Sequence, residues 1–525
     1  MKKWKKALGA TLLGCLLASE VLGMDFDSAN PPVVEIAQGK LMGYMDGEVY
    51  AFLGIPYAKA ARFESPRQPD AWEGIRSAQA YGPTCPVPEQ TTVGTDEMVW
   101  PHRYWIQSED CLNLNIWTTS LEKEAKKPVL VFFHGGGYTN GSSIEGVAYE
   151  GRNLSAYGDA VVVTVNHRLN VLGFSDLTGF GSKYAEASNL GIKDLVASLQ
   201  WVQENIASFG GDPEAVTIFG QSGGGGKVTT LLRTPAAERL FARAVCMSGL
   251  FTGADGDDVR RVTTVMMEKL GLADKDVDAL KTMPYDQLSR AAEEAATEVG
   301  VYLSWSPVND GEYILEDYCE WAKEIPLMVG SCFSEFNYSF SAPGENKNDW
   351  TEEEITEHLT EKYGEKADAV AEAFAKVFPE RTLADAYFYD AYLSWVPISR
   401  DGVEEILNHK LEMATAPVYE YLFDYEAPVN GGTLAFHCSD LIYFFHNVDI
   451  PVLTRATGGG EAAHKVQDTM ASALIAFART GDPSTDGLVW KPYTKEEKNI
   501  CVFGEDSNCL ILGDEELIRL IKGTM

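Results

Sequence analysis

The chain of 525 residues carries a formal net charge of −34, and 45% of its residues are hydrophobic and 11% aromatic. So acidic a surface argues against binding to nucleic acid or to anionic membrane surfaces, which carry the same sign of charge. The apolar content suffices for a large core and argues against an intrinsically disordered chain. Length alone suggests about three domains. No linker, repeat or low-complexity tract divides the sequence, however, so we expect a single domain over residues 24–525.

The N-terminus has the pattern of an export signal. A lysine-rich start precedes an apolar segment, residues 7–18, that is too short for a permanent membrane anchor. We expect residues 1–23 to be a signal peptide or membrane-targeting segment, the protein to be exported, and the mature chain to lack an integral membrane span. Cys15 faintly resembles a lipoprotein processing site, but apolar residues continue beyond it where a tether should be polar. Lipid anchoring is therefore the less favoured form of export.

Short apolar runs alternate with helical patterns along most of the chain. Residues 32–57 predict an antiparallel sheet edge, and residues 66–93 are a loop rich in Pro and Gly. The expected strands that follow are residues 111–117, 129–133, 160–165, 215–219, 242–247, 325–330 and 418–423, and the expected helices include 192–209, 227–232 and 464–480. This alternation predicts an α/β protein with a large, mostly parallel central sheet and helices on both faces. Two acidic helical blocks, residues 255–299 and 350–411, look like insertions on this core.

A serine flanked by glycines joins a predicted strand to a predicted helix, in the run Gly220-Gln221-Ser222-Gly223-Gly224. This is the pattern of a nucleophile elbow, a tight turn that exposes a serine hydroxyl at the start of a helix. Neighbours without side chains let the strand and the helix approach, and N–H groups at the helix start can receive negative charge. A chance match is a serious alternative in a chain with 48 glycines, so the remaining parts of a site must be found.

Three glycines follow the predicted strand 129–133, in the run His134-Gly135-Gly136-Gly137-Tyr138. They could form no more than a tight turn. The functional interpretation is an oxyanion hole, because glycine lets backbone N–H groups crowd against a reacting carbonyl. The pairing of this run with the serine elbow is far more specific than either motif alone.

A serine nucleophile needs a base, and the chain order in this fold class is serine, acid, histidine. His437 follows a late strand and a loop with two consecutive glycines, which can bring an imidazole to the elbow, so we predict that His437 is the base. The other histidines beyond the serine lie in helical segments or beside core aromatics: His358, His409, His446 and His464.

The acid should lie on a loop after an intermediate strand. Glu335 follows the predicted strand 325–330 among apolar neighbours, where a carboxylate is costly unless it meets a partner. We therefore predict that Glu335 orients the imidazole and stabilises its protonated form. Asp310 is the alternative, but the sequence Asn309-Asp310-Gly311 is a turn signal and favours a capping role.

The chain has nine cysteines, and their spacing does not suggest a zinc site. Cys85 and Cys111 flank a loop, and a bond between them would stabilise the fold by about 3–4 kcal/mol on the chain-entropy estimate. Cys501 and Cys509 could form a disulfide across a terminal hairpin. The remaining cysteines beyond residue 200 lie in or beside apolar runs and are expected to be free core thiols: Cys246, Cys319, Cys332 and Cys438.

From about residue 33 to residue 503 the chain resembles the type-B carboxylesterases of the α/β-hydrolase superfamily. The matching segments are Phe52-Leu53-Gly54-Ile55-Pro56-Tyr57-Ala58, Glu109-Asp110-Cys111-Leu112-Asn113-Leu114, His134-Gly135-Gly136-Gly137, Asn166-His167-Arg168-Leu169, Phe209-Gly210-Gly211-Asp212-Pro213, Thr480-Gly481-Asp482-Pro483 and Trp490-Lys491-Pro492-Tyr493. The resemblance implies an α/β-hydrolase fold with helical insertions around an active-site gorge.

The resemblance also implies roles for particular residues. These are Ser222 as nucleophile, Glu335 as acid, His437 as base, oxyanion donors from Gly136, Gly137 and Gly223, and a disulfide between Cys85 and Cys111. Three positions depart from the family pattern. Gln221 and Gly223 replace the usual Glu and Ala around the serine, and Phe336 stands where a Gly commonly follows the acid.

We therefore expect a serine hydrolase that cleaves carboxylic esters through an acyl-enzyme. Its expected partners are water and short-to-medium, neutral or apolar acyl and aryl esters, and it should need no metal and no cofactor. One alternative is a non-catalytic binding or adhesion protein on the same fold, which the complete set of candidate residues disfavours. Another is an amidase or lipase that uses the same residues. No long apolar lid is evident, which favours shorter esters.

Overall fold

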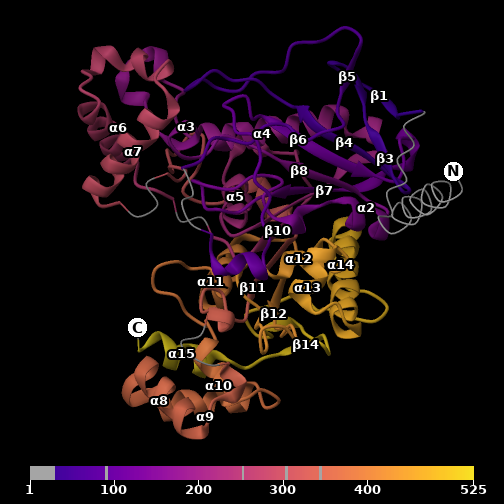
Figure 1. Ribbon diagram of the computed structural model, residues 1–525, viewed down its shortest axis with the longest axis vertical. Helices are drawn as coiled ribbons and strands as arrows, with labels where there is room; N and C mark the ends of the chain where they lie inside the picture. The colour runs from indigo at the N-terminus through magenta and orange to yellow at the C-terminus, as the bar shows by residue number, and fades with distance from the viewer. Residues whose placement is uncertain (1–29, 89–92, 251–252, 302–304, 342–345, 525) are drawn as a thin grey trace, which may run out of the picture.

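The computed structural model in Figure 1 describes residues 30–88, 93–250, 253–301, 305–341 and 346–524. The predicted signal segment, residues 1–23, lies outside this part of the chain. Within the described residues, one large sheet is built from β3 (Tyr44–Asp46), β4 (Val49–Pro56), β6 (Asn113–Thr118), β7 (Lys127–Phe133), β8 (Val161–Val165), β9 (Gly211–Gln221), β10 (Arg243–Met247), β11 (Leu327–Cys332), β12 (Val418–Phe423), β13 (Asn499–Phe503) and β14 (Asn508–Ile511).

The strand order is β14-β13-β12-β11-β10-β9-β7-β8-β6-β4-β3. The run from β8 to β13 is parallel, and antiparallel strands close both edges of the sheet. A smaller sheet joins β1 (Val33–Ile36), β2 (Gly39–Met42) and β5 (Ile75–Ser77). The expected large, mostly parallel sheet and the antiparallel N-terminal edge are both confirmed.

Helices cover both faces of this sheet. On β7, Val129, Val131 and Phe133 belong to one core and Leu130 and Phe132 to another, as the alternation of side chains along a strand requires. The first core includes residues of α4 (Leu190–Asn205), α5 (Gly223–Leu231) and α11 (Arg400–Met413), and the second includes residues of α2 (Arg152–Gly158), α12 (Asp440–Phe444) and α14 (Glu461–Thr480). Burial on both faces explains why residues 129–133 of this strand are all apolar.

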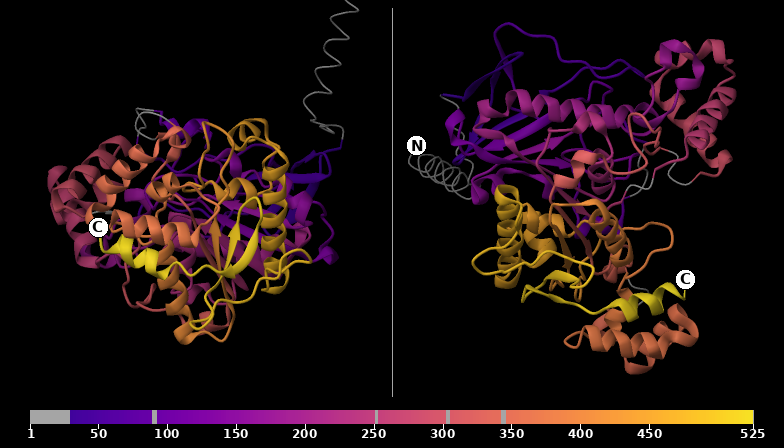
Figure 2. Two further views of the ribbon diagram at one scale, coloured as in Figure 1. Left: turned by 90° about the horizontal axis from the view of Figure 1, so that it is seen from below. Right: turned by 180° about the vertical axis from the view of Figure 1, so that it is seen from behind.

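Most helices of the two acidic helical blocks lie at opposite ends of the long axis of the molecule (Figures 1 and 2), but α11, which was predicted as part of the insertion 350–411, packs against β11 and β12 of the central sheet. One end holds α6 (Gly256–Lys269) and α7 (Tyr285–Val299), and the other holds α8 (Glu352–Tyr363), α9 (Ala367–Val377) and α10 (Leu383–Phe388), with α15 (Glu515–Lys522) against α9. α8 starts with a capping box, in which Thr351 and Glu354 accept each other's backbone N–H. Short helices α3 (Asn170–Phe174) and α13 (Pro451–Thr457) complete the set.

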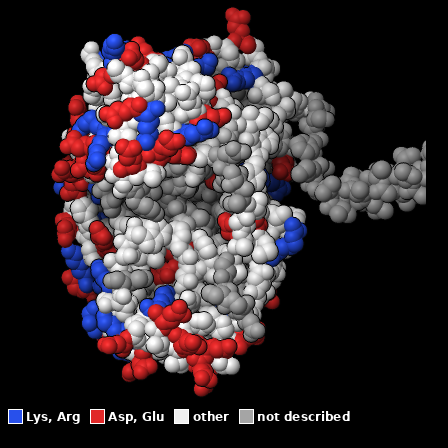
Figure 3. Space-filling view, turned by 60° about the vertical axis from the view of Figure 1, so that its left-hand side comes forward, with Lys and Arg blue, Asp and Glu red and all other residues white. Residues whose placement is uncertain are grey.

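Charged side chains ring the face that these two blocks flank, and a hollow with mainly uncharged surroundings opens in its middle (Figure 3). Acidic and basic groups are interspersed around the rim, although acidic ones prevail over the whole chain. In the part of the chain that the structure describes, no helix is both long and apolar enough to cross a membrane.

All eight cysteines in the described ranges are thiols, so the expected bond between Cys85 and Cys111 is not formed here. The two buried side chains are nevertheless neighbours, since the Cys85 thiol, together with burial, raises the pKa of Cys111. Backbone hydrogen bonds hold this region instead, from Thr84 N–H to Ile106 O at 2.9 Å and from Ser108 N–H to Thr84 O at 2.9 Å. In the terminal hairpin, Cys501 of β13 stands directly opposite Cys509 of β14, again as neighbouring thiols.

Several expected boundaries were wrong, and two of them lie next to candidate site residues. The strand predicted for residues 325–330 lies two residues further along, as β11, and therefore ends three residues before Glu335. The helix predicted from residue 227 begins at Gly223, within four consecutive glycines of low helix propensity. The short strand β5 also lies inside the predicted loop 66–93.

Candidate active site

Ser222 occupies a strained turn between β9 and α5. Its φ of 58° and ψ of −126° are rare for a residue with a side chain and cost about 1–3 kcal/mol. The turn is fixed on both sides, because Ser222 N–H donates to Met247 O at 2.8 Å and Ser222 O accepts from Gly226 N–H at 3.0 Å. The local geometry is that of a nucleophile elbow.

The glycines next to the serine allow backbones to cross almost in contact. A Cβ on Gly224 would collide with the carbonyl oxygen of Phe133, and a Cβ on Gly220 would collide with that of Gly224. The first turn of α5 therefore packs directly onto the end of β7, where the glycine run 135–137 begins. This close approach explains why α5 starts among glycines, before the better helix formers that begin at Lys227.

The glycine run lies against the serine. Gly136 and Gly137 have φ values of 79° and 60°, in the left-handed region that favours glycine. An ideal Cβ on Gly135 would lie 3.2 Å from the Cβ of Ser222, and one on Gly223 would overlap the carbonyl oxygen of Gly137. The three residues predicted to supply oxyanion donors thus gather beside the elbow. The same overlap gives a reason for glycine at position 223 in place of the usual alanine.

Glu335 and His437 meet through side chain and backbone. His437 Nδ1 lies 2.5 Å from Glu335 Oε2, and His437 N–H donates to Glu335 O at 2.8 Å. The other carboxylate oxygen, Oε1, accepts from Ser248 Oγ at 2.7 Å and from Cys332 N–H at 2.7 Å. Glu335 is fully buried, and these bonds offset the cost of removing a carboxylate from water. The short loop after β11 and the loop before α12 are therefore joined at this pair.

Gln221 and Phe336 complete the surroundings of the imidazole. With Nδ1 donating to the carboxylate, His437 Nε2 is the acceptor, and the amide nitrogen of the buried Gln221 lies 3.2 Å from it. The amide oxygen of Gln221 accepts from the Cys438 thiol at 3.1 Å. The ring of Phe336 lies on the imidazole with centroids 4.4 Å apart and an interplanar angle of 32°.

The alternative candidates make other contacts. Asp310 accepts the backbone N–H groups of residues 312–314, so it caps its own turn as expected. The other histidines considered as the base also have partners elsewhere. His409, His446 and His464 contact the exposed carboxylates of Asp317, Asp468 and Asp449, and His358 packs against the ring of Trp350.

Sequence reasoning missed three buried polar side chains near the site. Ser248, at the end of β10, binds the acid. Asp440 is fully buried three residues after His437; burial raises its pKa to about 7, and Tyr421 donates a hydrogen bond to it at 2.8 Å. Lys227 is fully buried in α5. Asp440 directly precedes the apolar run 441–445, which was the available signal for that residue, whereas nothing in the sequence marked Ser248 or Lys227.

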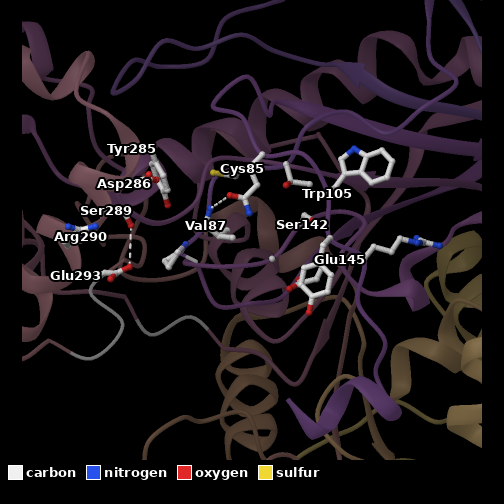
Figure 4. Close-up of a pocket in the computed structure, with 16 residues that line it drawn as sticks. Cys85, Val87, Trp105, Ser142, Glu145, Tyr285, Asp286, Ser289, Arg290 and Glu293 are labelled. Atoms are coloured by element: carbon white, nitrogen blue, oxygen red, sulfur yellow. Dashed lines mark hydrogen bonds between the residues drawn. The ribbon is translucent and has the colours of Figure 1, made fainter. Parts of the chain in front are cut away.

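A cavity of about 830 Å³ opens beside the segment that follows the glycine run (Figure 4). Tyr285, Ser289 and Glu293 of α7 form one wall, and Ser142 and Glu145 lie on the opposite side. The described residues that line it include none of the predicted serine, acid and base. Nor do the described residues contain a group of three or more His, Cys, Asp or Glu side chains placed to hold a metal ion.

In comparisons with known proteins, the chain is similar to esterases and related hydrolases. A sequence model of the carboxylesterase family matches residues 30–515. A para-nitrobenzyl esterase of Bacillus subtilis is 32% identical over 92% of this chain and 96% of its own length. A phenmedipham hydrolase of Pseudarthrobacter oxydans is 30% identical over 90% and 95%. A solved esterase of the anaerobe Clostridium hathewayi, described as hydrolysing aliphatic aromatic polyesters, superposes with a TM-score of 0.87 at 39% identity, covering 95% of this chain and 100% of that one. The fold is therefore the α/β-hydrolase fold.

Proposed function

The chain belongs to the carboxylesterase family and is a carboxylic ester hydrolase, and from this premise we propose that Ser222, His437 and Glu335 perform the cleavage. The observation that carries the proposal is the 2.5 Å contact between His437 Nδ1 and the Glu335 carboxylate. It leaves Nε2 of the imidazole as a base, in a chain whose serine is held in an elbow beside a glycine run.

In the first half of the reaction, Ser222 Oγ attacks the ester carbonyl while His437 Nε2 takes its proton. The oxyanion that forms is held by the N–H groups of Gly136, Gly137 and Gly223. The imidazolium then protonates the leaving alcohol, and an acyl-enzyme remains. For the first proton transfer, Gln221 has to rotate its amide away from Nε2, which it contacts at 3.2 Å.

In the second half, His437 takes a proton from water, and the resulting hydroxide attacks the acyl-enzyme. A second tetrahedral intermediate collapses, the acid leaves, and Ser222 recovers its proton. Glu335 holds the ring in the required tautomer and stabilises the imidazolium in both halves. This cycle uses side chains, backbone N–H groups and water, and no step calls for a metal or cofactor.

We propose short-to-medium, neutral or apolar acyl and aryl esters as substrates. Phe336 links the imidazole to Trp395, whose ring centroid lies 4.9 Å away and which is 49% exposed. Such a surface suits the stacking of an aryl group on the path to the base. Three relatives support this choice by what they are named for: para-nitrobenzyl esters, phenmedipham and aliphatic aromatic polyesters.

We also propose that residues 24–525 form one exported catalytic domain and that Cys85 and Cys111 become oxidised after export. Their proximity as thiols supports the second point, because an oxidising compartment favours bonds between neighbouring cysteines. Counting free thiols in the secreted protein under denaturing conditions, with and without reductant, tests it. A count that reductant leaves unchanged would contradict it.

A substrate panel tests the proposed chemistry. Hydrolysis of p-nitrophenyl acetate, butyrate and octanoate, together with butyryl p-nitroanilide, is compared between the wild type and Ser222→Ala. We expect the acetate and butyrate to react fastest, the anilide slowest, and the variant to lose turnover of every ester. A variant as active as the wild type would exclude Ser222. A wild type inert to all four compounds would favour the adhesion alternative.

A further inference from the structure

Lys227 is a buried cation that contacts the glycine run. It lies one helical turn after Gly223 in α5, its side chain is fully buried, and its Nζ donates to the carbonyl oxygen of His134 at 2.8 Å. Partly buried Glu145 supplies a favourable charge in the vicinity. The reaction cycle above does not use this lysine.

Burying the charge of a lysine at this position costs free energy. Burial lowers the pKa of Lys227 to about 7, which measures how strongly its surroundings disfavour the charge. An apolar side chain of similar length would fill the same volume without this cost, and replacing buried ions in that way is often neutral or stabilising. We therefore expect the lysine to lower the stability of the fold and to bring a compensating gain in function.

The hydrogen bond from Lys227 starts a short chain of contacts along the glycine run. The Lys227 ammonium holds His134 O, and His134 Nδ1 lies 2.9 Å from Gly135 O. In a trans peptide the C=O and N–H groups point in opposite directions, so anchoring a carbonyl fixes the direction of the N–H in the same unit. The Gly135 carbonyl shares its peptide unit with the N–H of Gly136, one of the proposed oxyanion donors.

The two imidazoles near Lys227 are neutral, so Lys227 carries the positive charge at this place. The ring of His134 is stacked on that of His167, with centroids 5.0 Å apart, and Tyr138 lies 5.8 Å from Nζ. Burial, and next the charge of Lys227, hold the pKa of both imidazoles well below the ordinary value, so both rings are neutral. Neutral His134 can donate from Nδ1 to the Gly135 carbonyl.

We propose that Lys227 is a positioning residue for the oxyanion hole. Its ammonium anchors the His134 carbonyl so that the N–H groups of the glycine run stay directed at the reacting carbonyl, and its charge stabilises the developing oxyanion from behind. This inference deepens the proposed function and rests on it.

Lys227→Met tests the proposal, with Thr234→Val as the matched control. Thr234 is equally buried just beyond the end of α5, and its hydroxyl binds Thr230 O at 2.9 Å, away from the glycine run. For Lys227→Met we expect kcat on p-nitrophenyl butyrate to fall by about tenfold or more, short of the roughly 10²–10³-fold loss of a whole donor. KM should stay within about twofold, as for an interaction made in the transition state.

Two further measurements distinguish a positioning role of Lys227 from a purely structural role. The affinity of Lys227→Met for an aryl trifluoromethyl ketone, which forms a tetrahedral oxyanion on the serine, should fall by the same factor as kcat. Its Tm should match or exceed that of the wild type. Thr234→Val should show the reverse, a lower Tm with unchanged kcat. A Lys227→Met enzyme with wild-type kcat and ketone affinity would overturn the proposal.

If the variant does not fold, the pH dependence of kcat in the wild type tests the proposal independently. Because the ammonium is the active form, kcat should decline on the alkaline side with an apparent pKa near 7, as Lys227 loses its proton. A wild-type kcat that stays constant up to pH 9 would overturn the proposal. Loss of all wild-type activity, or full activity in Ser222→Ala, would instead reject the proposed function itself.

Discussion

The Glu335 carboxylate lies 2.5 Å from Nδ1 of His437, and the backbone N–H of His437 donates to the carbonyl of the same Glu335 at 2.8 Å. Two loops that are far apart in the sequence are thus joined twice at one pair of residues. The ring is held against the carboxylate by backbone geometry as well as by charge. The acid is in turn fixed by Ser248 and by the N–H of Cys332.

Glu335→Gln should abolish most of the activity while preserving the fold. A glutamine retains the size of the acid, but it cannot stabilise an imidazolium and it favours the wrong tautomer of His437. We expect kcat to fall by roughly 10³–10⁴-fold, as loss of the charge does in such triads, with a smaller change in KM. Steady-state kinetics on p-nitrophenyl butyrate, with circular dichroism to check the fold, measure this. Near wild-type kcat would show that another group orients the base.

Gly223→Ala should damage the oxyanion site, although alanine is the usual residue of the family at this position. The added Cβ would overlap the carbonyl oxygen of Gly137, so the glycine run must move. We expect kcat to fall by about 10²-fold, as for removal of one oxyanion donor. Gly487→Ala is the control, because a Cβ there meets nothing within 4 Å. If both variants have wild-type kcat, the glycine run does not require glycine at position 223.

Phe336→Gly should weaken the preference for aryl esters. The Phe336 ring lies 4.4 Å from the imidazole and 4.9 Å from the ring of Trp395, so its loss removes the middle of an aromatic surface. An aromatic contact contributes about 0.5–1.5 kcal/mol beyond its buried area. The ratio of kcat/KM for phenyl butyrate over ethyl butyrate should therefore drop by roughly two- to tenfold. Phe336→Leu, which keeps bulk without an aromatic face, should lose part of the ratio. An unchanged ratio in both variants would exclude Phe336 from substrate selection.

The stability cost of Lys227 should depend on pH. Its pKa of about 7 in the fold lies below its ordinary value of 10.5, so between these two values the unfolded chain binds more protons than the folded one. The free energy of unfolding contributed by this group therefore rises with pH across that window. Urea unfolding at pH 6.5, 8 and 9.5 should show Lys227→Met more stable than the wild type, with a margin that shrinks as pH increases. A margin that is independent of pH would mean that Lys227 does not lose its proton in the fold.

Much of the central sheet could be predicted because burial on both faces leaves continuous apolar runs, as in residues 129–133. That Glu335 meets a partner could be predicted from the cost of a carboxylate among apolar neighbours, and the partner is His437. The start of α5 could not, because a contact with Phe133 decides it and helix propensity does not. The contacts of Ser248 and Lys227 were equally inaccessible, since their partners come from distant parts of the chain. The loop between Cys85 and Cys111 only suggested their pairing and the resemblance implied it, and proximity of two thiols does not set their oxidation state.

Labelling with a fluorophosphonate probe tests directly whether Ser222 is the activated nucleophile, because the probe reacts only with a serine that a neighbouring base activates beside oxyanion donors. After complete inactivation, the site of modification is mapped by mass spectrometry of peptides. We expect one adduct per chain, on Ser222, with ester hydrolysis lost in proportion to labelling. An adduct on a different residue, or full hydrolytic activity in a protein that takes up no probe, would contradict it.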